Sequence, residues 1–283
     1  MFFCLMHFII FILVSFITGL VVGSFLNVVI LRGARGEGLG GRSRCDKCAK
    51  ALGWKELIPI VSFLFQKGRC RGCGAALLWQ YPLVETATAL AYAVAIWRLA
   101  PYLSFDLKSV FLIMGALVAV SAGVVIIVSD LRFQIIPNGA VGTLLALGVA
   151  ATVLGRGIRI RHPVPGADLP AVMGQAIVAD VAAAAVLAGT LFLLWFFSRG
   201  RWMGLGDPKL IFATSLLIGF PQSLAAFLFS FWLGGIAGGL LLAAGRKGLK
   251  SRIPLGPFII AGTLLAYFLS DYFFTLTGFS LLF

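Results

Sequence analysis

The fold of this chain is constrained first by a series of apolar runs that recurs along its 283 residues. A helix needs about 20 apolar residues to cross the hydrocarbon core of a bilayer, and most of the runs reach or approach that length. The runs cover residues 7–31, 83–100, 106–129, 138–155, 172–198, 210–220, 222–244 and 256–280. Because only 12% of the residues are charged, a soluble globular domain is excluded. We therefore expect an all-α polytopic membrane protein with about eight transmembrane helices.

The run at 210–220 is short for a full crossing. At 1.5 Å per residue it reaches only about 17 Å, against a hydrocarbon core of about 30 Å. We expect a helix that is tilted, lies in thinned bilayer, or continues into polar ends.

The distribution of basic residues predicts the orientation of the helices. The formal net charge is +13, and 18 of the 23 Lys and Arg residues lie on one side when successive runs alternate in direction. Cytoplasmic loops carry an excess of Lys and Arg, so this side is predicted to be the inner one, with the N-terminus outside. The cluster Arg156–Arg161 is an exception on the outer side. No basic face interleaved with aromatic residues is present, so nucleic acid is not an expected partner.

Residues 32–80 form the one sizeable polar block and contain two Cys-x-x-Cys pairs, Cys45/Cys48 and Cys70/Cys73. The pairs are separated by 21 residues, a spacing typical of tetrahedral thiolate coordination of zinc. A segment of about fifty residues has too little core to fold unaided, so a structural metal is expected. Redox-active cysteines are the alternative interpretation of the same pairs.

The inner end of the first run carries small and polar residues at helical spacing. Gly23, Ser24 and Asn27 lie on one side of the expected helix, where they can face a partner helix. Ordinary helix packing and a functional role are both open at this point.

Two aspartates lie at the ends of apolar runs. Asp130 follows the run that ends at Ser129, and Asp207 lies in Gly204–Leu210 (GLGDPKL). The charge distribution places both on the inner side, and ionisable groups beside a membrane segment are functional candidates. Two carboxyl groups that share a proton supply a base for water and an acid for a substrate carbonyl. The alternative is that they only cap helices, since Asp207 followed by Pro208 is a typical N-cap sequence.

Two further carboxylates lie within or beside apolar runs. If the helix of the run at 172–198 starts at Val181, Asp180 lies at the outer membrane boundary. Glu85 lies just inside the inner end of the run at 83–100, where it can pair with an arginine or line a site.

Several motifs, in order along nearly the whole chain, resemble those of the type IV prepilin peptidases, which are bifunctional leader peptidases and N-methyltransferases. Asp130 with Ile136–Asn138 resembles the first catalytic motif, and Gly204–Leu210 resembles the second, which is shared more loosely with presenilin-like proteases. The other matching motifs are Gly23–Ile30 with Arg32, the two cysteine knuckles with Ile58, Pro59 and Gly68–Arg71, Tyr81–Glu85, and Ile253–Phe258. Pro208 and the missing proline in the first knuckle depart from the family pattern, but neither removes a catalytic or ligand atom.

By this resemblance, Asp130 and Asp207 are the catalytic pair of an aspartic endopeptidase. The implied substrates are prepilins and pseudopilins of type IV pilus and type II secretion systems. The implied cut falls after a glycine, ahead of an apolar helix, at the cytosolic face of the bacterial inner membrane. The resemblance also implies N-methylation of the new N-terminus with S-adenosylmethionine, although the sequence contains no glycine-rich methyltransferase fingerprint.

We divide the chain into a first transmembrane helix (1–31), a cytosolic zinc-binding domain associated with methyl transfer (32–80) and a membrane-embedded aspartyl peptidase domain (81–283). A methyl donor is polar and cytosolic, so we expect it between the zinc-binding domain and the inner ends of the first two helices. Gly68 permits a close backbone approach, and Glu85 can accept a hydrogen bond from a ligand amine, so these are the candidate donor-binding residues.

Two other classes of protein explain part of the sequence. A zinc-stabilised membrane scaffold, with lipids and partner proteins but no chemistry, explains the cysteines and the helices and leaves the aspartates as caps. A transporter would place Asp180 and the break near Pro221 at a midplane site. The lack of two mutually similar halves argues against the transporter.

Overall fold

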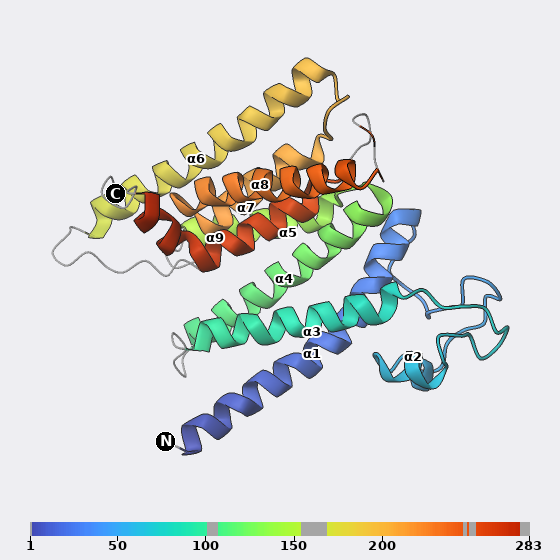
Figure 1. The fold of residues 1–283 in the computed structure, drawn as a ribbon. Helices are drawn as coiled ribbons and strands as arrows, with labels where there is room; N and C mark the ends of the chain where they lie inside the picture. The colour runs from blue at the N-terminus through green and yellow to red at the C-terminus, as the bar shows by residue number, and fades with distance from the viewer. Residues whose placement is uncertain (1, 101–106, 154–168, 246–247, 249–252, 278–283) are drawn as a thin grey trace. The chain divides into compact units, whose positions relative to one another are not determined.

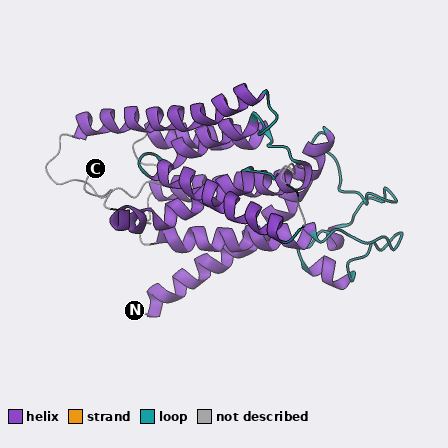
Figure 2. Ribbon diagram, turned by 45° about the horizontal axis from the view of Figure 1, so that its top comes forward, coloured by secondary structure: helices purple, strands orange, loops and turns teal. Residues whose placement is uncertain are grey.

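The computed structural model describes residues 2–100, 107–153, 169–245, 248 and 253–277, which form helices and loops with no β-strand among them (Figure 2). Each of the eight apolar runs coincides with a helix. These helices are α1 (Phe2–Arg35), α3 (Gln80–Leu99), α4 (Leu107–Phe133), α5 (Asn138–Val153), α6 (Leu169–Ser198), α7 (Gly206–Ile218), α8 (Gln222–Ala243) and α9 (Gly256–Thr277). The polar segment after α1 adds the 3-10 turn η1 (Trp54–Glu56) and the short helix α2 (Val61–Phe65). The Arg156–Arg161 cluster lies outside the described residues.

Four helices of the described chain are long and apolar enough to cross a membrane. They are Ile9–Arg35, Ser109–Phe133, Ala176–Ser198 and Gln222–Ala243, with Asn138–Val153 and Gly256–Leu269 as shorter apolar helices. The surface of α1 fits lipid, because Leu13, Ile17 and Val21, spaced four residues apart, are each more than half exposed. The chain is therefore an all-α, multi-pass membrane protein, as predicted.

The chain divides into two compact units, Met1–Val128 and Ser129–Phe283. In the first unit, α1 and α3 pack side by side along much of their length (Figure 1). Two glycines of α1 permit this close approach. A Cβ atom at Gly19 would lie 2.6 Å from the Cα atom of Ala89, and one at Gly23 would lie 2.8 Å from the Cα atom of Glu85.

The polar residues of α1 that were expected to face a partner helix face α3. The buried Asn27 side-chain amide donates to the backbone oxygens of Gly23 and Tyr81, at 3.3 Å each. Its carbonyl oxygen accepts from Gln80 Nε2 at 3.1 Å. Because each of these polar groups is hydrogen-bonded, the buried amide stabilises the junction of α1 and α3 instead of weakening it.

In the second unit, α7 is the central helix. Ten of its thirteen residues are buried, and it contacts α5, α6, α8 and α9 (Figure 1). The contact with α5 is close because Gly148 has no side chain. A Cβ atom there would lie 3.0 Å from the backbone nitrogen of Leu217. The buried Thr152 hydroxyl donates to the backbone oxygen of Gly148 at 2.9 Å and also lies 3.5 Å from that of Leu216 in α7.

The shortness of α7 that the sequence predicted is confirmed. Its thirteen residues reach about 20 Å, less than the roughly 30 Å of a hydrocarbon core. The helix stops at Gly219, whose φ of 74° is in the left-handed region that favours glycine. The Gly219 N–H still donates to the Ser215 oxygen at 2.8 Å, which closes the last turn.

The sequence-based start of the helix around Asp180 was wrong. The helix around it does not start at Val181, because α6 begins at Leu169, eleven residues before Asp180. Asp180 is 0% exposed, and its Oδ1 atom accepts a hydrogen bond of 2.7 Å from the Phe220 N–H. The helix can continue through a buried aspartate because the α7–α8 loop supplies a hydrogen-bond donor for the carboxyl group.

Candidate functional site

The two aspartates selected from the sequence lie in the second unit and are both buried. Asp130 is in the last turn of α4 and is 5% exposed, and Asp207 is the second residue of α7 and is 6% exposed. Asp130 lies near enough for its negative charge to affect the Asp207 carboxyl group. The fold therefore brings together two carboxyl groups that are 77 positions apart in the sequence, within electrostatic range of each other.

A backbone N–H group holds the Asp130 carboxyl group. Gly256, the first residue of α9, donates to Asp130 Oδ2 at 2.8 Å. A Cβ atom at this glycine would lie only 2.7 Å from the same oxygen. The role of Gly256 was missed from the sequence, although it lies in the Ile253–Phe258 motif that carried part of the resemblance.

The Asp207 carboxyl group is held by its own turn. Gly204 donates its N–H to Asp207 Oδ2 at 3.2 Å. Gly206 packs on the segment that follows Asp130, since a Cβ atom there would lie 2.9 Å from the Cβ atom of Ile136. The second glycine of the motif thus permits the contact between the two aspartate motifs.

The N-cap interpretation of Asp207 was wrong. The cap residue of α7 is Leu205, and Asp207 lies inside the first turn of the helix. A carboxylate in the first turn is still favoured by the helix dipole and the unpaired N–H groups there. Its side chain, however, bonds backward to Gly204 and not forward into the helix. Capping alone therefore does not account for this aspartate.

An apolar groove of about 450 Å³ adjoins the Asp207 motif between α5, α6 and α7. Its lining residues are Asn138, Val141, Gly142, Leu145, Ala188, Gly189, Phe192, Leu205, Pro208, Lys209 and Phe212. Because residues on both sides of Asp207 contribute to the wall, the surroundings of this carboxyl group suit an apolar segment of a substrate.

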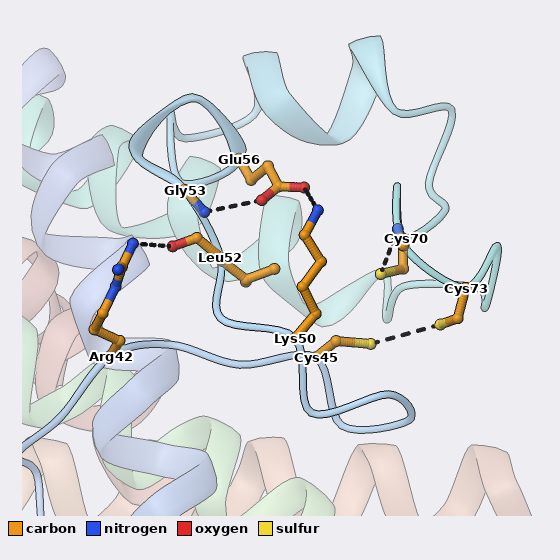
Figure 3. A network of polar contacts seen from close by, with 9 residues as sticks. Arg42, Cys45, Lys50, Leu52, Gly53, Glu56, Cys70 and Cys73 are labelled. Carbon is orange, nitrogen blue, oxygen red and sulfur yellow. Dashed lines mark hydrogen bonds and ion pairs between the residues drawn. The ribbon is translucent and has the colours of Figure 1, made fainter.

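The four cysteines of the polar block come together in the first unit. Their Sγ atoms all lie within 4.8 Å of one another, and the Cys45 and Cys73 Sγ atoms are 3.9 Å apart (Figure 3). None of the four is in a disulfide. Zinc–sulfur bonds of about 2.3 Å in a tetrahedron place sulfurs about 3.8 Å apart. The cysteine set therefore fits a tetrahedral metal ion.

The two knuckles have the same backbone construction. Arg44 bridges to Ala51 in the first knuckle, and Arg69 bridges to Ala76 in the second. In each, the residue after the second cysteine has a positive φ, 55° at Ala49 and 70° at Gly74. The N–H groups of Cys73 and Gly72 lower the pKa of Cys70 to about 6, which favours the thiolate that binds metal.

Polar contacts support the chain between the knuckles (Figure 3). Glu56 accepts the N–H of Gly53 at 2.8 Å and forms an ion pair with Lys50 at 3.3 Å. Arg42 donates to the Leu52 oxygen at 3.2 Å. These contacts are polar and the segment has little apolar core of its own, as expected for a module that depends on a metal to fold.

A cavity of about 930 Å³ lies within the first unit, where the methyl-donor site was expected. The C-terminal end of α1, the glycine-rich loop 36–44, the first knuckle and the start of α3 line it. Arg32 shapes one wall, because its guanidinium group donates to the backbone oxygens of Leu39 and Arg42 at 2.8 and 3.1 Å.

Glu85 and Gly68 differ in their relation to this cavity. Glu85 lines it, is 5% exposed, and accepts the Ile60 N–H at 2.7 Å. Gly68 is not among the lining residues. Its φ is +66°, and a Cβ atom there would lie 3.2 Å from the ring of Phe63, which does line the cavity. The part played by Phe63 was not visible in the sequence.

The fold and the site define a multi-pass helical membrane protein with two buried, interacting carboxyl groups and a separate four-cysteine module. The family model described as the bacterial peptidase A24 N-terminal domain matches residues 17–99, and that of the type IV leader peptidase family matches residues 117–239. The chain belongs to the type IV leader peptidase family.

Curated relatives support this assignment along nearly the whole chain. A prepilin leader peptidase/N-methyltransferase of Bacillus subtilis (strain 168) is 33% identical, over 91% of this chain and 94% of the relative. Proteins with the same name from Myxococcus xanthus (strain DK1622) and Pseudomonas aeruginosa are 32% and 29% identical, over 84% and 89% of this chain and 65% and 88% of the relatives. No solved structure gave a significant match.

Proposed function

We propose that this protein cleaves the leader peptides of prepilins and pseudopilins, with Asp130 and Asp207 as the catalytic pair. The observation that carries the proposal is the burial of these two interacting carboxyl groups in one helical unit. The substrate class rests on the names of the relatives, which are prepilin leader peptidases.

The two carboxyl groups divide the work of peptide hydrolysis. One ionised carboxylate takes a proton from a water molecule, which attacks the scissile carbonyl carbon. The other, protonated, carboxyl group donates to the carbonyl oxygen and then assists departure of the amine. The N–H groups of Gly256 and Gly204 each hold one Oδ2 atom, so both carboxyl groups are oriented before the substrate binds.

We also propose that the protein methylates the new N-terminus of its product, as the names of its relatives state for those proteins. The cavity of the first unit is the proposed site for S-adenosylmethionine, whose sulfonium group supplies the methyl group. Its volume of about 930 Å³ exceeds what this donor needs and leaves room for a peptide terminus. The Glu85 carboxylate lines this cavity, where it can accept a hydrogen bond from the amine of the methyl donor or from the new N-terminus of the product. The same carboxylate also accepts the backbone N–H of Ile60.

The four-cysteine module is the proposed binding site of one structural zinc ion. Cys45, Cys48, Cys70 and Cys73 supply four thiolates, which closes the coordination sphere and leaves no position for substrate. The ion would tie the two knuckles together and thereby fix one wall of the cavity.

The proposed location is the bacterial inner membrane, with the N-terminus outside and both aspartates at the cytosolic face. This orientation rests on the excess of Lys and Arg in the segments of that side. It places the catalytic pair and the four-cysteine module on the side where a prepilin leader lies before cleavage.

One experiment tests the peptidase and the methyltransferase together. The purified protein is incubated with a prepilin, with and without S-adenosylmethionine, and the product is weighed by mass spectrometry. We expect loss of the leader in both reactions and one added methyl group only when the donor is present. An unchanged prepilin in both reactions, with correctly inserted protein, would contradict the proposal.

A further inference from the structure

Asp180 is a buried acidic residue that the proposed mechanism does not use. It lies in the interior of α6, is 0% exposed, and accepts the Phe220 N–H at 2.7 Å. Phe220 belongs to the three-residue loop between α7 and α8. Asp180 therefore connects α6 to the point at which α7 ends.

The α7–α8 loop contains backbone N–H groups that need hydrogen-bond acceptors inside the protein. Its backbone leaves the helical path at Gly219, and it is flanked in the sequence by Ile218, Ala225 and Ala226, which belong to one buried apolar cluster. A backbone N–H in such a region needs a hydrogen-bond partner inside the protein. A carboxyl group is a strong acceptor for it, and the 2.7 Å distance is short for an N–H donor.

The other end of α7 carries Asp207. This end is held by the contact of Gly206 with Ile136, and the last turn of the helix, next to Phe220, packs on Gly148 through Leu217. A helix of thirteen residues behaves as a stiff rod about 20 Å long, so a shift at one end moves the other. The hydrogen bond to Phe220 therefore restricts sliding of α7 along its own axis.

We propose that Asp180 is a positioning residue for the catalytic pair: its hydrogen bond to the Phe220 N–H sets the axial position of α7 and so the place of Asp207 relative to Asp130. The inference rests on the proposed peptidase function. In this role the side chain acts as a hydrogen-bond acceptor and not as a third acid or base. An asparagine, whose carbonyl oxygen is an acceptor of the same shape, should serve equally well.

The test compares Asp180→Leu, which has the same branched heavy-atom skeleton and no acceptor, with Asp180→Asn in full-length protein. We expect Asp180→Leu to lower kcat for prepilin cleavage on the order of 10²-fold with KM nearly unchanged, because catalytic geometry is lost while the substrate surface remains. Asp180→Asn should restore kcat to within about threefold of the unmodified protein, because it keeps the acceptor.

A matched control separates positioning from general destabilisation. Thr263 in α9 is buried and donates to the Ile259 oxygen at 2.8 Å, a bond within its own helix. Thr263→Val removes this buried hydrogen bond with little change of shape and should leave kcat nearly unchanged. If Thr263→Val and Asp180→Leu lower kcat equally, Asp180 has no special relation to the active site and the inference fails.

Other outcomes also overturn the inference. Unchanged kcat in Asp180→Leu contradicts it, as does a loss of kcat in Asp180→Asn as large as in Asp180→Leu. The asparagine variant is the one that must fold and cleave under this proposal, so its failure to cleave overturns the inference even if the leucine variant does not accumulate. Unmodified protein and Asp207→Asn are assayed in parallel. If the former fails to cleave or the latter cleaves, the proposed function fails; if both behave as expected, only the role of Asp180 is at stake.

Discussion

At the scale of single residues, each carboxyl group of the proposed catalytic pair accepts a hydrogen bond from a glycine N–H, and at Gly256 an added Cβ atom would collide with the Asp130 carboxyl group. Gly256 and Gly204 donate N–H groups to Asp130 and Asp207, and Gly206 permits the contact of one aspartate motif with the other. The glycines of these motifs are thus part of the geometry of the site. The site therefore consists of the two carboxyl groups together with their backbone N–H donors.

Asp130→Asn and Asp207→Asn should each reduce prepilin cleavage by about 10²- to 10⁴-fold, the range that general acid–base catalysis contributes. Asparagine keeps the shape and cannot exchange a proton, so insertion and extraction of the protein should not change. A pair that shares one proton is inactive when both groups are ionised, so the cleavage rate of the unmodified protein should also fall as pH rises. Cleavage assays over a pH series measure both effects, and activity in either single variant rules out the pair.

Gly256→Ala should lower cleavage although it adds only one methyl group. The new Cβ atom would meet Asp130 Oδ2 at 2.7 Å, so the carboxyl group has to move away from its N–H donor. We expect kcat to fall about 10- to 100-fold, as for a displaced catalytic group. Gly235→Ala in α8, where no atom lies within 4 Å of the new Cβ, is the matched control and should cleave normally. Equal activity of the two variants would show that the Asp130 position tolerates the shift.

At the scale of structural elements, the four-cysteine module consists of two knuckles that have little core of their own. Cys45 and Cys70 are buried and Cys48 and Cys73 are exposed, so each knuckle contributes one cysteine of each kind. The N–H groups directed at Cys70 favour its thiolate form before any metal binds. The arrangement is that of a site whose folding and metal binding occur together.

Cys70→Ser should lower the bound zinc from one ion per chain toward zero and make residues 32–80 sensitive to protease. The reason is that three thiolates hold the ion less tightly than four, and the module has few other interactions that keep it folded. Metal analysis of the purified protein and limited proteolysis provide the two readouts. Cys4→Ser, outside the module, serves as the control. Metal-free protein with the four cysteines linked in disulfides would show that the pairs are redox groups instead.

At the scale of the whole molecule, the two proposed activities belong to different units. The aspartates and their glycines lie between Ser129 and Phe283, and the cavity and the cysteines lie between Met1 and Val128. Each unit has its own packed helices, α1 with α3 in the first and α7 with its four neighbours in the second. Changes confined to one unit are therefore expected to affect one activity.

Gly68→Leu should reduce methylation of the processed prepilin and leave cleavage largely intact. A side chain at Gly68 pushes the Phe63 ring toward the cavity, and the positive φ adds strain of about 1–2 kcal/mol. Gly74→Ala is the control, since Gly74 has a similar φ of +70° and no atom within 4 Å of a new Cβ. Mass spectrometry distinguishes cleaved from cleaved-and-methylated product. If every change in residues 32–80 lowers both activities equally, the activities are not separable.

The sequence by itself determined the class of fold and most of the candidate site residues. Apolar runs and charge distribution are local properties of the chain, so they predicted the eight helices and the multi-pass architecture. The cysteine spacing likewise predicted the four-thiol cluster, because each knuckle is a short turn with its own backbone bonds. Asp130 and Asp207 were chosen from their position beside apolar runs and from their motifs.

Only the tertiary structure decided how these residues are held. The Gly256 N–H reaches Asp130 across 126 positions, and Phe220 reaches Asp180 across 40. Such contacts join residues that are far apart in the sequence through tertiary packing, which no local pattern encodes. For the same reason the sequence placed Asp180 just before the start of a helix and left an N-cap role open for Asp207, because a buried carboxyl group cannot be distinguished from a helix-end residue until the partner that satisfies it is known.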